Sequence, residues 1–190
     1  MFTLRAATSP LWTEAVLNDF DLFLNDHAAA EKKASGMAMS MALHYRDKTR
    51  LVNAMVDLAI EELTHFREVV HLLNQRQLIL APDERDPYVN ALRKQCRIGE
   101  QEGLIDRLIT GSIIEARGAE RFGLVAEALT DDSLKRFYTS IARSEAKHFQ
   151  LFIELANHYF AATEVQARLD QLLDFEAQLV TELPPRPALH

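Results

Sequence analysis

The chain has 190 residues, an apolar fraction of 48% and a formal net charge of −7, which together predict one ordinary globular domain over residues 1–190. This composition excludes general disorder. The negative charge argues against an extended nucleic-acid-binding surface, although a local basic patch remains compatible with it. Cys96 is the single cysteine, so an intrachain disulfide and a cysteine-based zinc site are excluded. Because no apolar run approaches the roughly 20 residues that span a bilayer, we expect a soluble, cytoplasmic protein.

The predicted elements are all helices, because apolar residues recur with helical spacing and no alternating stretch is long enough for a good strand. In chain order, we expect long helices at about 18–45 and 48–75, then a long crossover at 77–87 that contains Pro82 and Pro87. A short helical piece at 88–97 precedes long helices at 100–129 and 131–160, the last capped by Asp131 or Asp132. A further C-terminal helix is expected at about 163–182, followed by a non-helical tail.

This order of elements predicts the fold class. Two close helix pairs joined by one long crossover match a ferritin-like four-helix bundle, with its core at about 18–160 and an additional C-terminal helix. The expected fold class is therefore all-α.

Two copies of a Glu-x-x-His motif carry the chemistry, at Glu62–His65 and Glu145–His148. Residues three apart on a helix lie within about 60° of each other and about 4.5 Å apart along its axis, so each pair can reach one metal ion. In both helices the pair interrupts an apolar stripe that faces the core.

The motif alone is not specific, since a third copy occurs at Glu68–His71. Helical phase separates this copy from the others. Glu68 and His71 point about 120° and about 180° away from Glu62, which predicts that they are solvated.

Two more carboxylates lie at the centres of inward stripes on the other long helices. Glu31 precedes Glu62 by 31 residues and Glu115 precedes Glu145 by 30, which indicates a pseudo-repeat of two helical hairpins. Glu120 is the rival of Glu115, but it lies about 140° around the helix, and we prefer Glu115.

Burying four carboxylates among apolar residues costs several kcal/mol each unless they are paired or neutralised, and no matching set of inward lysines or arginines is expected. Divalent cations supply the missing charge. A Glu from each of two helices and a Glu-x-x-His from each of the other two is the ligand set of di-iron and di-manganese bundles. We therefore expect two iron ions, with manganese or zinc as possible substitutes, on six ligands: Glu31, Glu62, His65, Glu115, Glu145 and His148. His27, one turn before Glu31, is more typical of a satisfied core histidine than of a donor to that ligand.

The amino-acid sequence around these ligands resembles that of a known family. The segments DHAAAEKKASGMAMSMALHY, EELTHFREVVHLL, IIEARGAERFGLV and SEAKHFQLF are similar to those of bacterial tRNA hydroxylases of the MiaE type, from about Phe20 to Tyr159. The resemblance implies an enzyme, a di-iron monooxygenase that uses dioxygen and electrons from an external donor. Its implied substrate is the isopentenyl group of 2-methylthio-N6-isopentenyladenosine in tRNA, and its implied ligands are the six residues named above.

A tRNA substrate requires a basic patch that the net charge does not reveal. The clusters Arg46–Arg50 and Arg93–Arg97 are each more typical of an ordinary solvated surface. Given the resemblance, we expect a patch that includes Lys32, Lys33, Arg46, Lys48 and Arg50. Two alternatives remain open from the residues: a ferritin-like iron-storage or peroxide-scavenging protein with the same ligands, and a metal-free helical scaffold.

Overall fold

The computed structural model describes residues 2–190, and every regular element within that range is an α-helix. The helices are α1 (Pro10–Asn18), α2 (Phe20–His44), α3 (Thr49–Gln75), α4 (Pro87–Arg93), α5 (Glu100–Ala128), α6 (Asp132–Tyr159) and α7 (Ala162–Glu182). The all-α prediction is confirmed. The long helices begin and end within two residues of the predicted bounds. The short piece expected at 88–97 is wrong at its end, because α4 stops at Arg93.

Contacts between Cα atoms divide the chain into two compact units. One contains residues 18–84 and 187–189, and the other contains the residues up to Leu17, 85–186 and His190. The prediction of a single domain over the whole chain stays a prediction. Among the helices of residues 2–190, none combines the length and the apolar character that crossing a bilayer requires.

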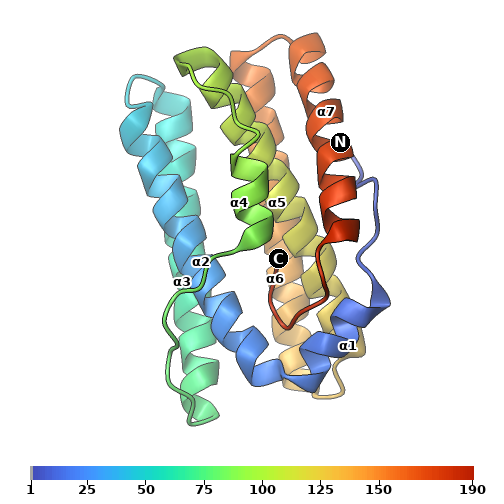
Figure 1. Cartoon of the computed structure of the whole chain (residues 1–190). Helices are drawn as coiled ribbons and strands as arrows, with labels where there is room; N and C mark the ends of the chain where they lie inside the picture. The colour runs from blue at the N-terminus through green and yellow to red at the C-terminus, as the bar shows by residue number, and fades with distance from the viewer. Residues whose placement is uncertain (1) are drawn as a thin grey trace. The chain divides into compact units, whose positions relative to one another are not determined.

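The first of these units is built on the antiparallel hairpin of α2 and α3, which run side by side (Figure 1). Asp19 caps α2 by accepting a hydrogen bond from the Leu22 N–H at 3.2 Å. Between the two helices, the Ser35 hydroxyl donates to the main-chain oxygen of Ala59 at 2.8 Å. The buried serine fixes the register of the hairpin, which decides the side chains that α2 and α3 place opposite each other.

The long crossover lies between α3 and α4 and has no helix of its own. Side chains of α2 hold it. Asn25 Oδ1 accepts a hydrogen bond from the Ala81 N–H at 2.8 Å, and Lys32 Nζ donates to Asp83 at 2.6 Å. The crossover is therefore fastened along α2.

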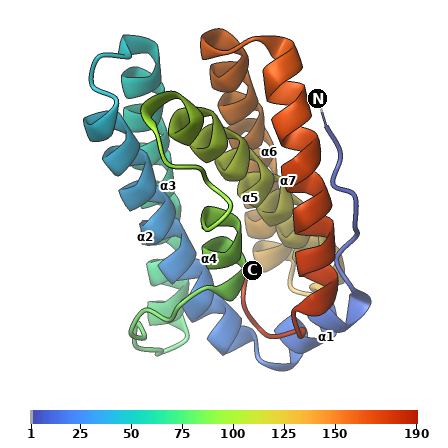
Figure 2. The same cartoon turned by 45° about the horizontal axis from the view of Figure 1, so that its top comes forward.

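The second unit is built on the antiparallel hairpin of α5 and α6, against which α4 and α7 pack (Figure 2). Asp131 caps α6 as predicted, accepting from the N–H groups of Ser133 at 2.8 Å and Leu134 at 2.9 Å. The Ser112 hydroxyl donates to the main-chain oxygen of Phe149 at 2.7 Å. A buried serine thus links the two helices here, as in the other hairpin.

The helix α1 was not among the predicted elements. Pro10 occupies its first turn, where a missing N–H costs nothing, and the Ser9 hydroxyl accepts from the Leu11 N–H at 3.3 Å. The segment before it runs along α7 (Figure 2), where Arg5 donates to the Asp170 main-chain oxygen at 3.0 Å and pairs with the Asp174 carboxylate.

One arginine of α5 points inward, although it does not pair with the predicted ligands. Arg117 and Glu176 are both fully buried, and their side chains pair with Arg117 Nη2 at 2.7 Å from Glu176 Oε1. The Tyr88 hydroxyl donates to the same carboxylate at 2.9 Å. This network joins α5, α7 and α4, and its arginine already has glutamate partners of its own.

Candidate metal centre

Three of the predicted ligands come together in the α2–α3 hairpin. Glu31 on α2 and Glu62 and His65 on α3 offer ligand atoms that all lie within 4.8 Å of one another. These residues are 4%, 1% and 8% exposed. His65 Nδ1 lies 3.3 Å from Glu62 Oε2 and 3.6 Å from Glu31 Oε2. The predicted helical phase therefore places two carboxylates and one imidazole at one buried point.

Charge at this triad is unbalanced. Burial lowers the pKa of His65, but hydrogen bonds and charge interactions with Glu31 and Glu62 outweigh burial and raise it to about 10. The imidazole is then protonated at neutral pH and offsets one of the two negative charges. A divalent cation in place of that proton offsets both carboxylates, which is why this donor set fits a metal ion.

His27 holds one of these ligands in place. It is fully buried, and its Nε2 lies 2.7 Å from Glu31 Oε1. Burial and repulsion from His65 lower the pKa of His27 to about 3, so it is neutral at pH 7 and donates through Nε2–H. His27 is thus the satisfied core histidine that was expected, and its partner is a predicted ligand. The four-residue spacing was the available signal.

The other three predicted ligands come together in the α5–α6 hairpin. Glu115 on α5 and Glu145 and His148 on α6 offer ligand atoms within 4.8 Å of one another. They are 6%, 3% and 3% exposed, and His148 Nδ1 lies 3.6 Å from Glu145 Oε2. A Cβ added to Gly118 would lie 3.8 Å from Glu145 Oε2, an ordinary contact. A methyl group therefore fits beside this ligand, whereas a larger side chain would press on the carboxylate.

The rival residues lie elsewhere. The Glu120 carboxylate accepts from the Thr8 N–H at 3.1 Å and the Thr8 hydroxyl at 2.6 Å, and it pairs with Arg117. Glu68 and His71, the third copy of the motif, are both exposed as expected. These glutamates and this histidine have structural or solvated roles.

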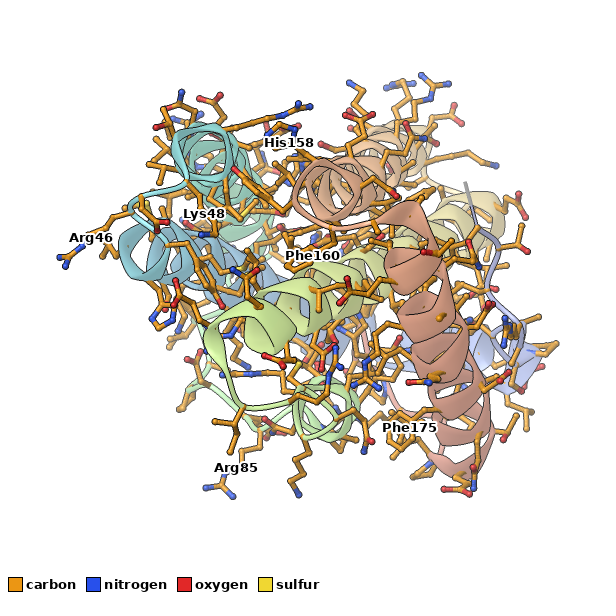
Figure 3. The ribbon with its side chains drawn as sticks, turned by 90° about the horizontal axis from the view of Figure 1, so that it is seen from above. Arg46, Lys48, Arg85, His158, Phe160 and Phe175 are labelled. Carbon is orange, nitrogen blue, oxygen red and sulfur yellow. The ribbon has the colours of Figure 1, made fainter. Side chains whose placement is uncertain are left out.

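The basic patch expected on α2 and at the α2–α3 turn is partly engaged within the chain. Lys32 bonds to Asp83, Lys33 Nζ donates to the main-chain oxygen of Glu84 at 2.7 Å, and Lys48 pairs with its neighbour Asp47. Arg46 extends away from the ribbon into solvent (Figure 3). The lysines at 32 and 33 therefore fasten the crossover.

Comparisons with known proteins cover nearly the whole chain. A family model described as "tRNA-(MS[2]IO[6]A)-hydroxylase (MiaE)" matches residues 2–190. A Pseudomonas putida protein named tRNA 2-(methylsulfanyl)-N(6)-isopentenyladenosine(37) hydroxylase is 35% identical over 177 residues, covering 93% of this chain and 86% of that protein. A Salmonella typhimurium protein of the same name is 37% identical over 131 residues, covering 69% of this chain and 48% of that protein.

A solved structure is also similar. It is titled "Protein 43 with aldehyde deformylating oxygenase activity from Synechococcus" and matches with a TM-score of 0.95 and 33% identity, over 100% of this chain and 96% of that one. The all-α, ferritin-like fold class predicted from the sequence is confirmed by this match. Since one fold hosts many substrates, the structural match alone does not choose among oxygenase reactions.

Proposed function

Because the chain belongs to the MiaE family of tRNA hydroxylases, we propose that it hydroxylates the isopentenyl group of 2-methylthio-N6-isopentenyladenosine in tRNA. The observation that carries this proposal is the pair of buried triads, each with two carboxylates and one imidazole within 4.8 Å. Since the proposed substrate is tRNA, we expect the enzyme to act in the cytoplasm.

The two triads would hold two iron ions, one Glu-x-x-His pair and one further glutamate in each. Ions of this size bind oxygen and nitrogen donors at about 2.1 Å, so two donors of one ion lie at most about 4.2 Å apart. The ligand atoms of each triad lie within 4.8 Å of one another, close to that limit. Mixed carboxylate and imidazole donors suit iron or manganese, and affinity order makes zinc a competitor during purification. When bound, the iron pair supplies the redox chemistry that activates dioxygen.

The overall reaction is a monooxygenation. One oxygen atom of dioxygen enters a C–H bond of the isopentenyl group and the other leaves as water, so an external donor must supply two electrons and two protons. The chain's own part is to position and to exclude water. His27 orients Glu31 through the 2.7 Å hydrogen bond, and the ligands lie among apolar core residues such as Leu58 and Ile141. Gly118 leaves space beside Glu145.

The ligand assignment is tested by iron content. Glu115→Gln should bind no more than one iron per chain under conditions in which the wild type binds two. The matched control is Glu68→Gln, which alters an exposed glutamate in the same kind of motif and should bind as the wild type does. Equal iron content in both variants would exclude Glu115 as a ligand.

The reaction is tested with reduced, iron-loaded protein, dioxygen and tRNA that carries the isopentenylated adenosine. Mass spectrometry of the digested nucleosides should show one added oxygen atom on the isopentenyl group with the wild type and Glu68→Gln, but not with Glu115→Gln. If protein shown to hold two irons gives no such product, this substrate is rejected and iron storage or peroxide reduction becomes the leading function.

A further inference from the structure

The loop between α4 and α5, residues 94–99, is fastened by a buried carboxylate. Asp106 is fully buried and accepts from the Arg97 N–H at 2.8 Å and the Arg97 guanidinium at 2.9 Å. It also accepts from Arg168 on α7 at 2.8 Å, and Arg168 donates in turn to the Gln95 main-chain oxygen at 2.7 Å. Charge-assisted bonds of this kind are about twice as strong as neutral ones. The loop therefore has a defined shape.

The tip of this loop presents an apolar side chain to solvent. Ile98 is 102% exposed, more than any other large apolar residue in the described chain. Gly99 follows it with φ at 138°, and a Cβ at Gly99 would lie 2.7 Å from Glu102 Oε2. The backbone thus turns sharply into α5 at a position that favours glycine. Hydrogen bonds hold the loop at Gln95 and Arg97, so the exposed Ile98 directly follows a held position.

Two exposed cations come shortly before this tip in the chain. The side chains of Arg93 and Lys94 are exposed and form no hydrogen bond or ion pair with any residue in the range 2–190. Arg97 differs, because its charge is shared with Asp106 and is also influenced by Glu102 and Glu164. The available positive charge therefore lies at Arg93 and Lys94, on a protein whose net charge is −7.

We propose that this loop docks the tRNA, with Arg93 and Lys94 on backbone phosphates and Ile98 against a base exposed when the modified adenosine leaves its stack. The inference rests on the proposed function. Enzymes that modify a nucleobase act on single-stranded nucleic acid or take the nucleotide out of its stack, and apolar side chains insert between unstacked bases in other complexes. Phosphate contacts by exposed cations supply the sequence-independent part of the affinity.

The geometry favours RNA over a protein partner. A standard protein interface buries about 800 Å² on each side around an apolar core. One projecting isoleucine with two exposed cations four and five residues before it is too small for such a core, but it is large enough to contact one unstacked base. Figure 2 shows the green segment that leads from α4 into α5.

The experiment measures binding of the isopentenylated tRNA to the iron-loaded protein without dioxygen, as a function of salt concentration. Arg93→Gln combined with Lys94→Gln should weaken binding about tenfold or more and reduce the slope of log K against log salt by about 1.4, which is about 0.7 per phosphate contact. The control is Arg67→Gln, an exposed cation on α3, which should leave the slope unchanged.

Ile98→Ser should raise the KM for tRNA about threefold to tenfold, by loss of the apolar contact with one base. Ile79 provides a matched control, because it is 89% exposed in the crossover, and Ile79→Ser should have the wild-type KM. All of these variants alter exposed side chains, and their circular dichroism should equal that of the wild type.

The outcomes separate this inference from the proposed function. No hydroxylated product from the wild type would reject the function itself. Product formation with unchanged tRNA affinity and salt slope in the Arg93, Lys94 and Ile98 variants would overturn the docking site. If those variants bind tRNA normally but turn over slowly only when the electron donor is limiting, the loop docks the donor and the inference is also overturned.

Discussion

Removing the Glu176 carboxylate should strongly destabilise the protein, because it leaves a buried cation without its main partner. Arg117 and Glu176 are both 0% exposed, and Arg117 donates to the carboxylate through Nε at 2.8 Å and Nη2 at 3.0 Å. Glu176→Ala also removes the acceptor of the Tyr88 hydroxyl. Breaking a buried pair from one side costs about 3–5 kcal/mol, so we expect the free energy of unfolding to fall by that amount.

The matched control is an exposed pair that also involves α7. Asp170 pairs with Arg5, and their side chains are 45% and 35% exposed, so Asp170→Ala should cost less than about 1 kcal/mol. Urea unfolding of the metal-free protein, followed by far-ultraviolet circular dichroism, measures both losses. The denaturant slope should stay constant, so that the midpoints report stability. A loss below about 1 kcal/mol in Glu176→Ala would refute the reasoning from burial.

Three further predictions concern the ligand shell, the glycines and acid stability. His27→Ala should weaken iron binding about tenfold to a hundredfold in competition titrations, and unchanged affinity would remove its orienting role. Gly36→Ala should stabilise the protein by about 1 kcal/mol, since nothing lies within 4 Å of the new Cβ. Gly111→Ala should destabilise it by about 1 kcal/mol, because the new Cβ would lie 3.1 Å from the Phe152 ring. Thermal unfolding of the two variants measures both effects. Burial raises the pKa of Asp86, but the hydrogen bond from His190 outweighs it and lowers the pKa to about 2 from 3.8. The ionised carboxylate therefore contributes about 2 kcal/mol to the free energy of unfolding above pH 4, and this contribution is lost as the pH falls through 2. Asp86→Asn keeps the helix cap and should flatten urea-measured stability in that window; a wild-type profile would contradict this.

The helices and the residues of each triad could be predicted because both follow from local spacing. Apolar periodicity predicted the long helices, and the Asp131 cap predicted the start of α6. Helical phase separated Glu62 and His65 from the exposed Glu68–His71 copy. The same phase argument selected Glu115 over Glu120. That the two triads hold iron together is still a prediction.

Arg117 could not be predicted to be buried, because assigning one apolar stripe to each helix assumes that the helix has a single inward face. α5 contacts α4, α6 and α7, and its buried residues therefore include Arg117 and Arg121 as well as Glu115. The partner of Arg117 is 59 residues away on α7, a separation at which local spacing carries no information. α1 is only 9 residues long, and its Ser9–Pro10 start was the one signal that marked it.

The single cysteine makes the loop before α5 open to kinetic measurement. Cys96 is half-buried, and its Sγ lies 3.5 Å from the Thr110 hydroxyl inside the segment held by Asp106. Because Cys96 is only half-buried, a thiol reagent can reach it in the folded loop, and the reaction rate reports how accessible the thiol is. With one thiol in the chain, that rate needs no correction for other sites. Comparing alkylation with and without bound RNA would then show how far a bound ligand covers this one loop.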